Sequence, residues 1–154
     1  EENVGIFRKK INELSPLKEN HPIEKIKIDV PMPMDYVSMD LIRELNILAP
    51  FGKDNPHPVF ADRNLSVTRM WLIGKNQNVL RMTLSTASGM PVSAIIFREV
   101  DSVLTYLMDK FGQQEYQAAL EGRKNRISFS AIYTPKINCF RETESIQFEI
   151  QEIQ

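Results

Sequence analysis

A two-residue alternation of apolar and polar side chains sets in after residue 60, and this pattern constrains the fold more than any other feature of the chain. Between residues 79 and 85, Leu80, Met82 and Leu84 alternate with Arg81 and Thr83. Because successive side chains of a β-strand point to opposite faces, the pattern predicts a strand with one buried face. Runs of the same kind predict further strands over residues 65–73, 92–97, 126–133 and 145–150.

Short connections and one helical segment join these runs. Polar turns at residues 75–78 and 87–89 predict an antiparallel meander of the first three strands. Apolar residues at helical spacing then predict a helix over residues 99–111, with Gly112 as a left-handed C-cap. Three strands, a helix and two strands match the five-stranded, partly open barrel called the OB-fold. The predicted fold class is therefore mainly β with α (α+β), and another small α+β sandwich is the alternative.

The first 60 residues follow different patterns. An apolar stripe at helical spacing predicts a short first helix, formed by Val4, Phe7, Ile11 and Leu14. A half-buried strand is predicted at residues 26–30, and Ser38 is expected to cap a helix over residues 39–48 whose apolar face holds Leu41, Leu45 and Leu48. Residues 49–60 contain three prolines and a glycine, which predicts an ordered loop anchored to the core by Phe51 and Phe60.

Composition narrows the class of protein. A chain of 154 residues suffices for one domain with an appendage. Its sequence has no apolar run long enough for a membrane span and no secretory leader, and its single cysteine, Cys139, suits a reducing compartment. We therefore expect a cytoplasmic protein without membrane contact. The net charge of −1 means that any nucleic-acid contact must come from a local patch, such as residues 8–10 or 123–126.

A long stretch of the sequence resembles a known family. Residues 44–52, Glu-Leu-Asn-Ile-Leu-Ala-Pro-Phe-Gly, and residues 55–60, Asn-Pro-His-Pro-Val-Phe, resemble the segment of RecJ-type single-strand-specific exonucleases that precedes their OB domain. The resemblance implies a division into the tail of a DHHA1-like domain with a connecting strand (1–34), a linker helix and Pro-rich loop (35–60), and an OB domain (61–154). Where the family usually has glycine, this chain has Asp54, a residue that tolerates a left-handed backbone.

The resemblance also implies an activity for a larger protein. RecJ-like enzymes degrade single-stranded DNA from the 5′ end in DNA repair and recombination, using manganese or magnesium ions held by an Asp-His-His triplet and further ligands. This chain has only His21 and His57 and no such triplet, so we expect no catalytic residues, metal or cofactor in it. The expected partners are single-stranded DNA, the remainder of a RecJ-like chain and a single-strand-binding protein.

OB-folds bind single strands mainly on their second and third strands, with cations for the phosphates and aromatic faces for the bases. If Leu80, Met82 and Leu84 point inward, Arg81 stands on the outer wall, and Ser93, Ile95 and Phe97 share that wall. The candidate DNA-binding residues are Arg69, Lys75, Arg81, Phe97, Arg123, Lys124, Arg126 and Arg141, with Lys53, His57 and Phe140 as rim positions.

Simpler interpretations compete with these assignments. For Phe97, a position in the core or against the helix is favoured over contact with a base. The core is also favoured for Trp71, although Arg69 interrupts the alternation of its strand and leaves the phase ambiguous. The chain could instead be a structural or protein-interaction module that closes the enzyme ring or docks a partner. An independent enzyme with Cys139 as nucleophile and His21 or His57 as base has no support from spacing or context.

Overall fold

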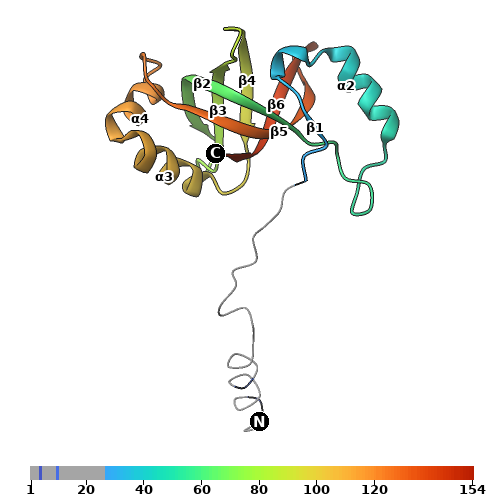
Figure 1. Cartoon of the computed structure of the whole chain (residues 1–154), viewed down its shortest axis with the longest axis horizontal. Coiled ribbons are helices and arrows are strands. Elements are labelled where there is room, and N and C mark those ends of the chain that lie inside the picture. The colour runs from blue at the N-terminus through green and yellow to red at the C-terminus, as the bar shows by residue number, and fades with distance from the viewer. Residues whose placement is uncertain (1–3, 5–9, 11–26) are drawn as a thin grey trace.

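A computed structural model describes residues 27–154 and the single positions 4 and 10. Its central feature is a barrel of five strands: β2 (Phe60–Ile73), β3 (Val79–Ser85), β4 (Pro91–Ile96), β5 (Ser128–Phe140) and β6 (Thr143–Ile153). Around the barrel the order is β2-β3-β4-β6-β5, and a pairing of β2 with β5 closes it. The β4–β6 pair is parallel, and the other neighbours run antiparallel. This is the OB-fold topology predicted from the sequence (Figure 1).

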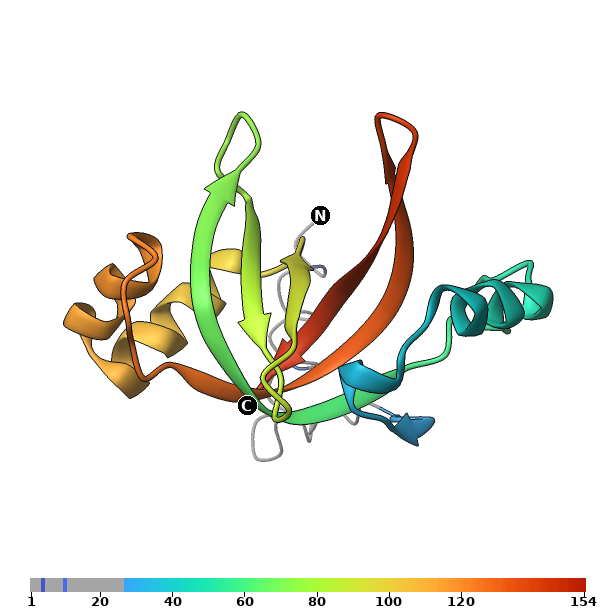
Figure 2. The same ribbon diagram turned by 90° about the horizontal axis from the view of Figure 1, so that it is seen from above.

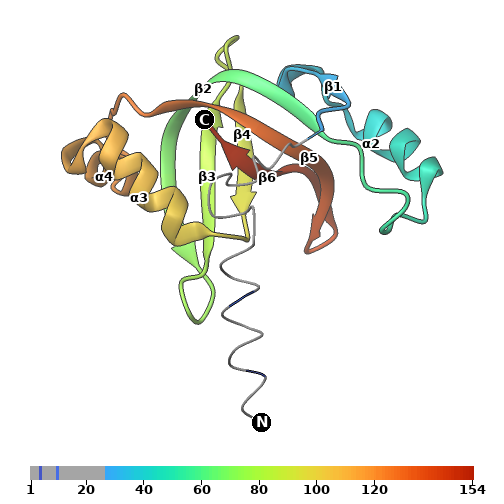
Figure 3. The ribbon, with the colours of Figure 1, turned by 60° about the horizontal axis from the view of Figure 1, so that its bottom comes forward.

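The interior of the barrel holds the apolar members of the alternating runs. Leu80, Met82 and Leu84 are fully buried. Ala94 and Ile96 of the neighbouring strand have exposed fractions of 0% and 2%. The inward face predicted for these strands is therefore confirmed. Helix α3 (Val100–Phe111) adds Val100, Leu104 and Leu107 to the same core. Figure 3 shows α3 and α4 (Gln113–Leu120) on one side of the barrel and α2 (Met39–Leu45) on the other.

Several element bounds differ from those predicted. β2, β5 and β6 are longer than their alternating cores, because β-bulges at Asp62–Leu65, Val67–Arg69 and Ile132–Tyr133 shift the alternation without ending the pairing. Helix α4 was not predicted, since it buries only the small side chains of Ala118 and Ala119 and so lacks a long apolar stripe. Gly112 has a positive φ of 88°, but its ψ of 155° lies outside the left-handed helical region, so the predicted left-handed C-cap is not formed, and α4 begins immediately after it.

The segment before the barrel packs against it through a different set of residues than expected. β1 (Val30–Pro31) pairs in parallel with the start of β2, and Ile28 and Val30 are exposed rather than half-buried. The most deeply buried residue of this segment is Met34, whose N–H donates to Asp62 Oδ2 at 2.8 Å. The first helix predicted over residues 4–14 and the start of the predicted strand at Ile26 lie outside the described residues, apart from Val4 and Lys10.

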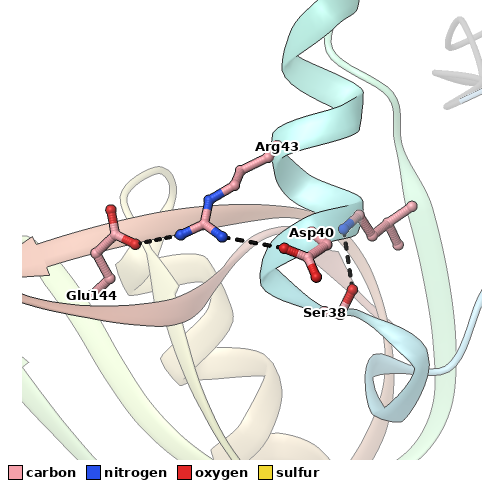
Figure 4. Close-up of polar contacts among 5 residues, drawn as sticks. Ser38, Asp40, Arg43 and Glu144 are labelled. Carbon is pink, nitrogen blue, oxygen red and sulfur yellow. Dashed lines mark hydrogen bonds and ion pairs between the residues drawn. The ribbon is translucent and has the colours of Figure 1, made fainter.

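Helix α2 has the predicted cap, because the Ser38 hydroxyl accepts a hydrogen bond from Leu41 N at 3.1 Å. Its buried residue is Ile42, whereas Leu48, expected on the apolar face, is 56% exposed in the 3-10 turn η3 (Asn46–Leu48). Arg43 of α2 contacts Asp40 at 3.2 Å and Glu144 of β6 at 2.8 Å (Figure 4). The ion pair of Arg43 with Glu144 thus joins α2 to the β5–β6 hairpin.

The Pro-rich loop after α2 is held by its own polar groups. Asn55 Nδ2 donates to Leu48 O at 2.8 Å and to Pro50 O at 3.1 Å. Phe60 belongs to the barrel core, but Phe51 packs on the His57 ring at 4.0 Å instead of reaching the core. Asp54 does not adopt a positive φ, so the left-handed backbone expected there is not required for the loop to close.

Tyr133 connects the approach segment to the barrel. Its ring is fully buried, and its hydroxyl donates to Met32 O at 2.8 Å. Burial, together with the charge of Asp62, raises the pKa of this hydroxyl, which keeps it a donor.

We expect Tyr133→Phe to lower the free energy of unfolding by about 0.5–1.5 kcal/mol, the net contribution of one such hydrogen bond. Urea denaturation measures it, with Tyr36→Phe as control, because Tyr36 is 75% exposed. Equal stability of the two variants would contradict the role given to Tyr133.

Within the part of the chain that the structure describes, no helix is both long enough and apolar enough to cross a bilayer.

Candidate nucleic-acid interface

The bulge in β2 decides where Trp71 points. The register shifts between Val67 and Arg69, so that Met70 takes the inward position and is fully buried. Arg69 and Trp71 consequently stand on the outer wall of the barrel. The core position favoured for Trp71 from the sequence is therefore wrong, because a bulge reverses the faces of all residues that follow it.

Trp71 and two arginines form one cluster on this wall. Trp71 of β2 pairs with Arg81 of β3 across the sheet. The guanidinium carbons of Arg69 and Arg81 lie 5.7 Å and 5.8 Å from the centre of the Trp71 ring, within the range of cation–π contacts. We call these three residues the Arg-Trp-Arg cluster. It brings together two predicted cations and an aromatic ring that sequence reasoning had placed elsewhere.

The two arginines of the cluster are available to an anion. Among the residues described, neither has a carboxylate oxygen within 4 Å. Arg81 Nε is buried and has no hydrogen-bond partner. A buried donor without an acceptor is costly, because its hydration is lost without replacement. Only an acceptor that reached Nε itself would relieve this penalty.

Lys75 and Phe97 flank the cluster at the end of the β2–β3 hairpin. Lys75 is exposed in the turn of residues 74–78, where Gly74 and Gln77 have positive φ values of 90° and 52°. Phe97 directly follows β4 and is 50% exposed, so the core interpretation of Phe97 is wrong. Together with Asn78 it lines a shallow hollow of about 340 Å³ between this turn and the start of α3. Ile95, expected beside Phe97 on the wall, is only 6% exposed and offers little surface.

The basic run at residues 123–126 is largely neutralised. Arg123 pairs with Glu121, and Arg126 contacts Glu115 through its guanidinium at 3.0 Å and its backbone N–H at 2.7 Å. The backbone N–H of Arg126, and then its side chain, lower the pKa of Glu115. Hydrogen bonds from the side chains of Gln117 and Arg123 likewise lower the pKa of Glu121. Both carboxylates are therefore ionised at neutral pH and offset their arginines.

Lys124 differs from its neighbours, because no ion pair holds it in the part of the chain that is described. The loop that carries it adjoins the Arg-Trp-Arg cluster. A Cβ placed on Gly122 would lie 3.3 Å from Arg69 Cδ, and Figure 2 shows the α4–β5 connection beside β2. Lys124 follows Gly122 by two residues, so its backbone lies near the end of the wall that Arg69 occupies.

Arg141, Phe140, Lys53 and His57 lie elsewhere. Arg141 and Glu142 form the tight β5–β6 turn with φ values of 47° and 65°. The Arg141 guanidinium stacks on Phe140 at 5.2 Å, and Phe140 is 66% exposed. Figure 2 shows the β2–β3 and β5–β6 hairpins rising on the same side of the barrel, well separated at their tips, with α2 and its following loop beside β5–β6. Lys53 and His57, in that loop, are therefore apart from the Arg-Trp-Arg cluster.

A model of the RecJ OB domain matches residues 28–152, which is most of the chain. The chain belongs to the RecJ OB-domain family. It is also 29% identical over 89 residues to the single-stranded-DNA-specific exonuclease RecJ of Bacillus subtilis (strain 168). That match covers 56% of this chain and 11% of the Bacillus protein, so the chain corresponds to a small part of the relative.

Solved structures of two single-strand-binding assemblies are distantly similar. One is a replication protein A heterotrimer bound to single-stranded DNA, with 16% identity and a TM-score of 0.37 over 63% of this chain and 31% of that chain. The other is the mitochondrial single-stranded DNA binding protein Rim1 of S. cerevisiae, with 10% identity and a TM-score of 0.32 over 60% of this chain and 90% of that chain. At these scores neither bears on the function of this chain.

The metal ions that the RecJ resemblance implies do not fit the residues present. Across residues 27–154, no three side chains of histidine, cysteine, aspartate or glutamate gather closely enough to hold a metal ion. We therefore derive no metal-dependent step from this domain.

Proposed function

We propose that this OB domain binds single-stranded DNA, with little sequence preference, on the outer wall formed by β2 and β3. The Arg-Trp-Arg cluster carries the proposal. Non-specific single-strand binding combines cations that follow the phosphates with aromatic rings on which bases stack. Arg69, Trp71 and Arg81 supply both on adjacent strands, and Lys75 and Phe97 extend the same surface at the hairpin end.

The cluster favours a single strand over a duplex. Trp71 is only partly buried, and the guanidinium groups of Arg69 and Arg81 lie over its ring, 5.7 Å and 5.8 Å from its centre. A base can stack on such a ring only if its own face is free, and in a duplex the neighbouring base pairs cover that face. Phosphates of a flexible strand can also adjust to the fixed arginines.

We further propose that the domain serves a longer RecJ-like protein that degrades single strands from the 5′ end with manganese or magnesium ions held outside this chain. Family membership and the match to the Bacillus exonuclease support this. In such a protein the barrel would raise the local concentration of the DNA strand near the active site, as linked binding modules do.

A protein-interaction role is the second candidate. Ile47 and Leu48, at the end of the linker helix, are 81% and 56% exposed, which is unusual for adjacent large apolar residues. A surface of this kind suits the remainder of a RecJ-like chain or a partner such as a single-strand-binding protein. It lies on the α2 side of the barrel and does not compete with the wall of β2 and β3 (Figure 2).

Fluorescence polarisation with a labelled oligonucleotide of about 20 bases tests the proposed function. We expect binding in the micromolar range at low salt and weaker binding of the same sequence as a duplex, because stacking needs free base faces. Binding of both forms with the same affinity would contradict the stacking role of Trp71. No binding of either form would leave protein interaction as the better account of the domain.

A further inference from the structure

The charge on the outer wall of the barrel is divided between two halves. One row of paired residues crosses the wall from Trp71 through Arg81, Ile95 and Glu149 to Thr134. One part of the row holds Trp71 of β2 and the cation Arg81 of β3, and the other part holds the carboxylate Glu149 of β6 beside Thr134 of β5. Ile95, which is almost fully buried, separates the two. A polyanion that followed this row would pass from a favourable to an unfavourable potential.

The basic half extends along β2 rather than across the sheet. Arg69, Trp71 and Ile73 follow one another at every second position, so β2 carries them on one face over about 13 Å, and Lys75 follows in the turn directly after the strand. At the Arg69 end, the loop of Gly122 adjoins the arginine side chain and adds Lys124. Among the described residues, no carboxylate pairs with Arg69, Lys75, Arg81 or Lys124.

The acidic half covers β6 and its surroundings. A groove of about 670 Å³ lies between α3 and β6, and its charged lining comprises Glu99, Glu149, Glu152 and Arg98. Glu149 pairs with Lys136 of β5, so these two charges offset each other, and Glu99 and Glu152 supply the remaining negative charge of the groove beside Arg98. At the hairpin tip Glu142 directly follows Arg141. A phosphate chain that reached Phe140 and Arg141 from Arg81 would have to pass these carboxylates.

We propose that the bound strand runs lengthwise along β2, from the turn at Lys75 over the Arg-Trp-Arg cluster to Lys124, and does not cross the barrel to the β5–β6 hairpin. This inference rests on the proposed function. It assigns Lys124 to the binding site and removes Arg141 and Phe140 from it. Coulomb repulsion by the carboxylates of β6 and attraction by the unpaired cations of β2 both act toward this path.

Lys124→Ala and Arg141→Ala form a matched pair of variants for the test. Each removes one charge from an exposed side chain that has no ion pair in the described part of the chain. The measurement is the affinity of the full 154-residue chain for a 20-base oligonucleotide, at several salt concentrations. We expect Lys124→Ala to flatten the plot of log affinity against log salt by about 0.7, the contribution of one single-strand phosphate contact. Arg141→Ala should leave the slope unchanged.

Other outcomes overturn the path in distinguishable ways. A flatter slope with Arg141→Ala shows that the strand crosses the barrel, and an unchanged slope with Lys124→Ala shows that it does not follow β2 to its end. In both cases the proposed function stands, provided that removal of Arg69 and Arg81 still weakens binding. If the unmodified chain does not bind, or if it binds equally well without these two arginines, the proposed function and the path fail together.

Discussion

Replacing Arg69 and Arg81 together by alanine should flatten the salt dependence of single-strand binding by about 1.4 in slope, because each phosphate contact contributes about 0.7. Affinity at low salt should fall at least about tenfold, since a hydrogen bond to a charged group contributes about 1.5–3 kcal/mol. The physical reason is the absence, among the described residues, of any carboxylate that neutralises these two side chains. Fluorescence polarisation at a series of salt concentrations measures both quantities.

A double variant of Lys53→Ala and Arg141→Ala is the control for this experiment. It removes the same formal charge from exposed residues on the β5–β6 side of the barrel (Figure 2). If overall charge governed binding, the two double variants would lose the same affinity and slope. That result would remove the Arg-Trp-Arg cluster from the site. Circular dichroism of both variants ensures that only folded chains are compared.

Trp71→Ala should weaken single-strand binding by about 1–3 kcal/mol, or about 5- to 150-fold in affinity, because it removes one base-stacking platform. The salt dependence should change little, since the tryptophan carries no charge. This combination separates Trp71 from the arginines, whose removal changes the slope. Phe140→Ala is the control, because Phe140 is also exposed and also stacks with an arginine, but on the other hairpin.

Trp71 also reports on binding directly, because it is the only tryptophan in the chain. A base stacked on its ring should quench the intrinsic fluorescence as single-stranded DNA is added, and duplex DNA should quench it less. Saturable binding detected by polarisation without any change in tryptophan emission would show that DNA binds away from this wall.

The sequence predicted the barrel well where alternation is uninterrupted. β3 and β4 each show a strict period of two, and their inward faces agree with the structure. It failed at β2, where the register shifts between Val67 and Arg69. Arg69 interrupts the alternation there, but this interruption alone does not decide which face Trp71 takes. It also failed at α4, because a short helix that buries alanines has no apolar stripe to detect.

The candidate site was predictable in part for a similar reason. The sequence predicts Arg69 and Arg81 as contacts, because arginines embedded in strands must end near solvent or an anion. Both stand on the outer wall. The neutralisation of Arg126 was not predictable, because Glu115 lies eleven residues away in a helix that the sequence did not reveal. Trp71 was misplaced because its orientation depends on the bulge. The register of β2 with β3, which no sequence pattern supplies, places Trp71 beside Arg81 on the outer wall.

The two-residue strand β1 pairs with the first residues of β2, on the edge that β3 leaves unpaired. β3 pairs with β2 only as far as Ser66, so the first residues of β2 have no partner on that side except Val30 and Pro31. An exposed edge offers free amides and carbonyls as a template on which another chain can add a strand. Pro31 has no amide hydrogen to donate, and therefore the pairing is not passed on to a further strand. This short segment therefore leaves less of the β2 edge open to pairing with another chain.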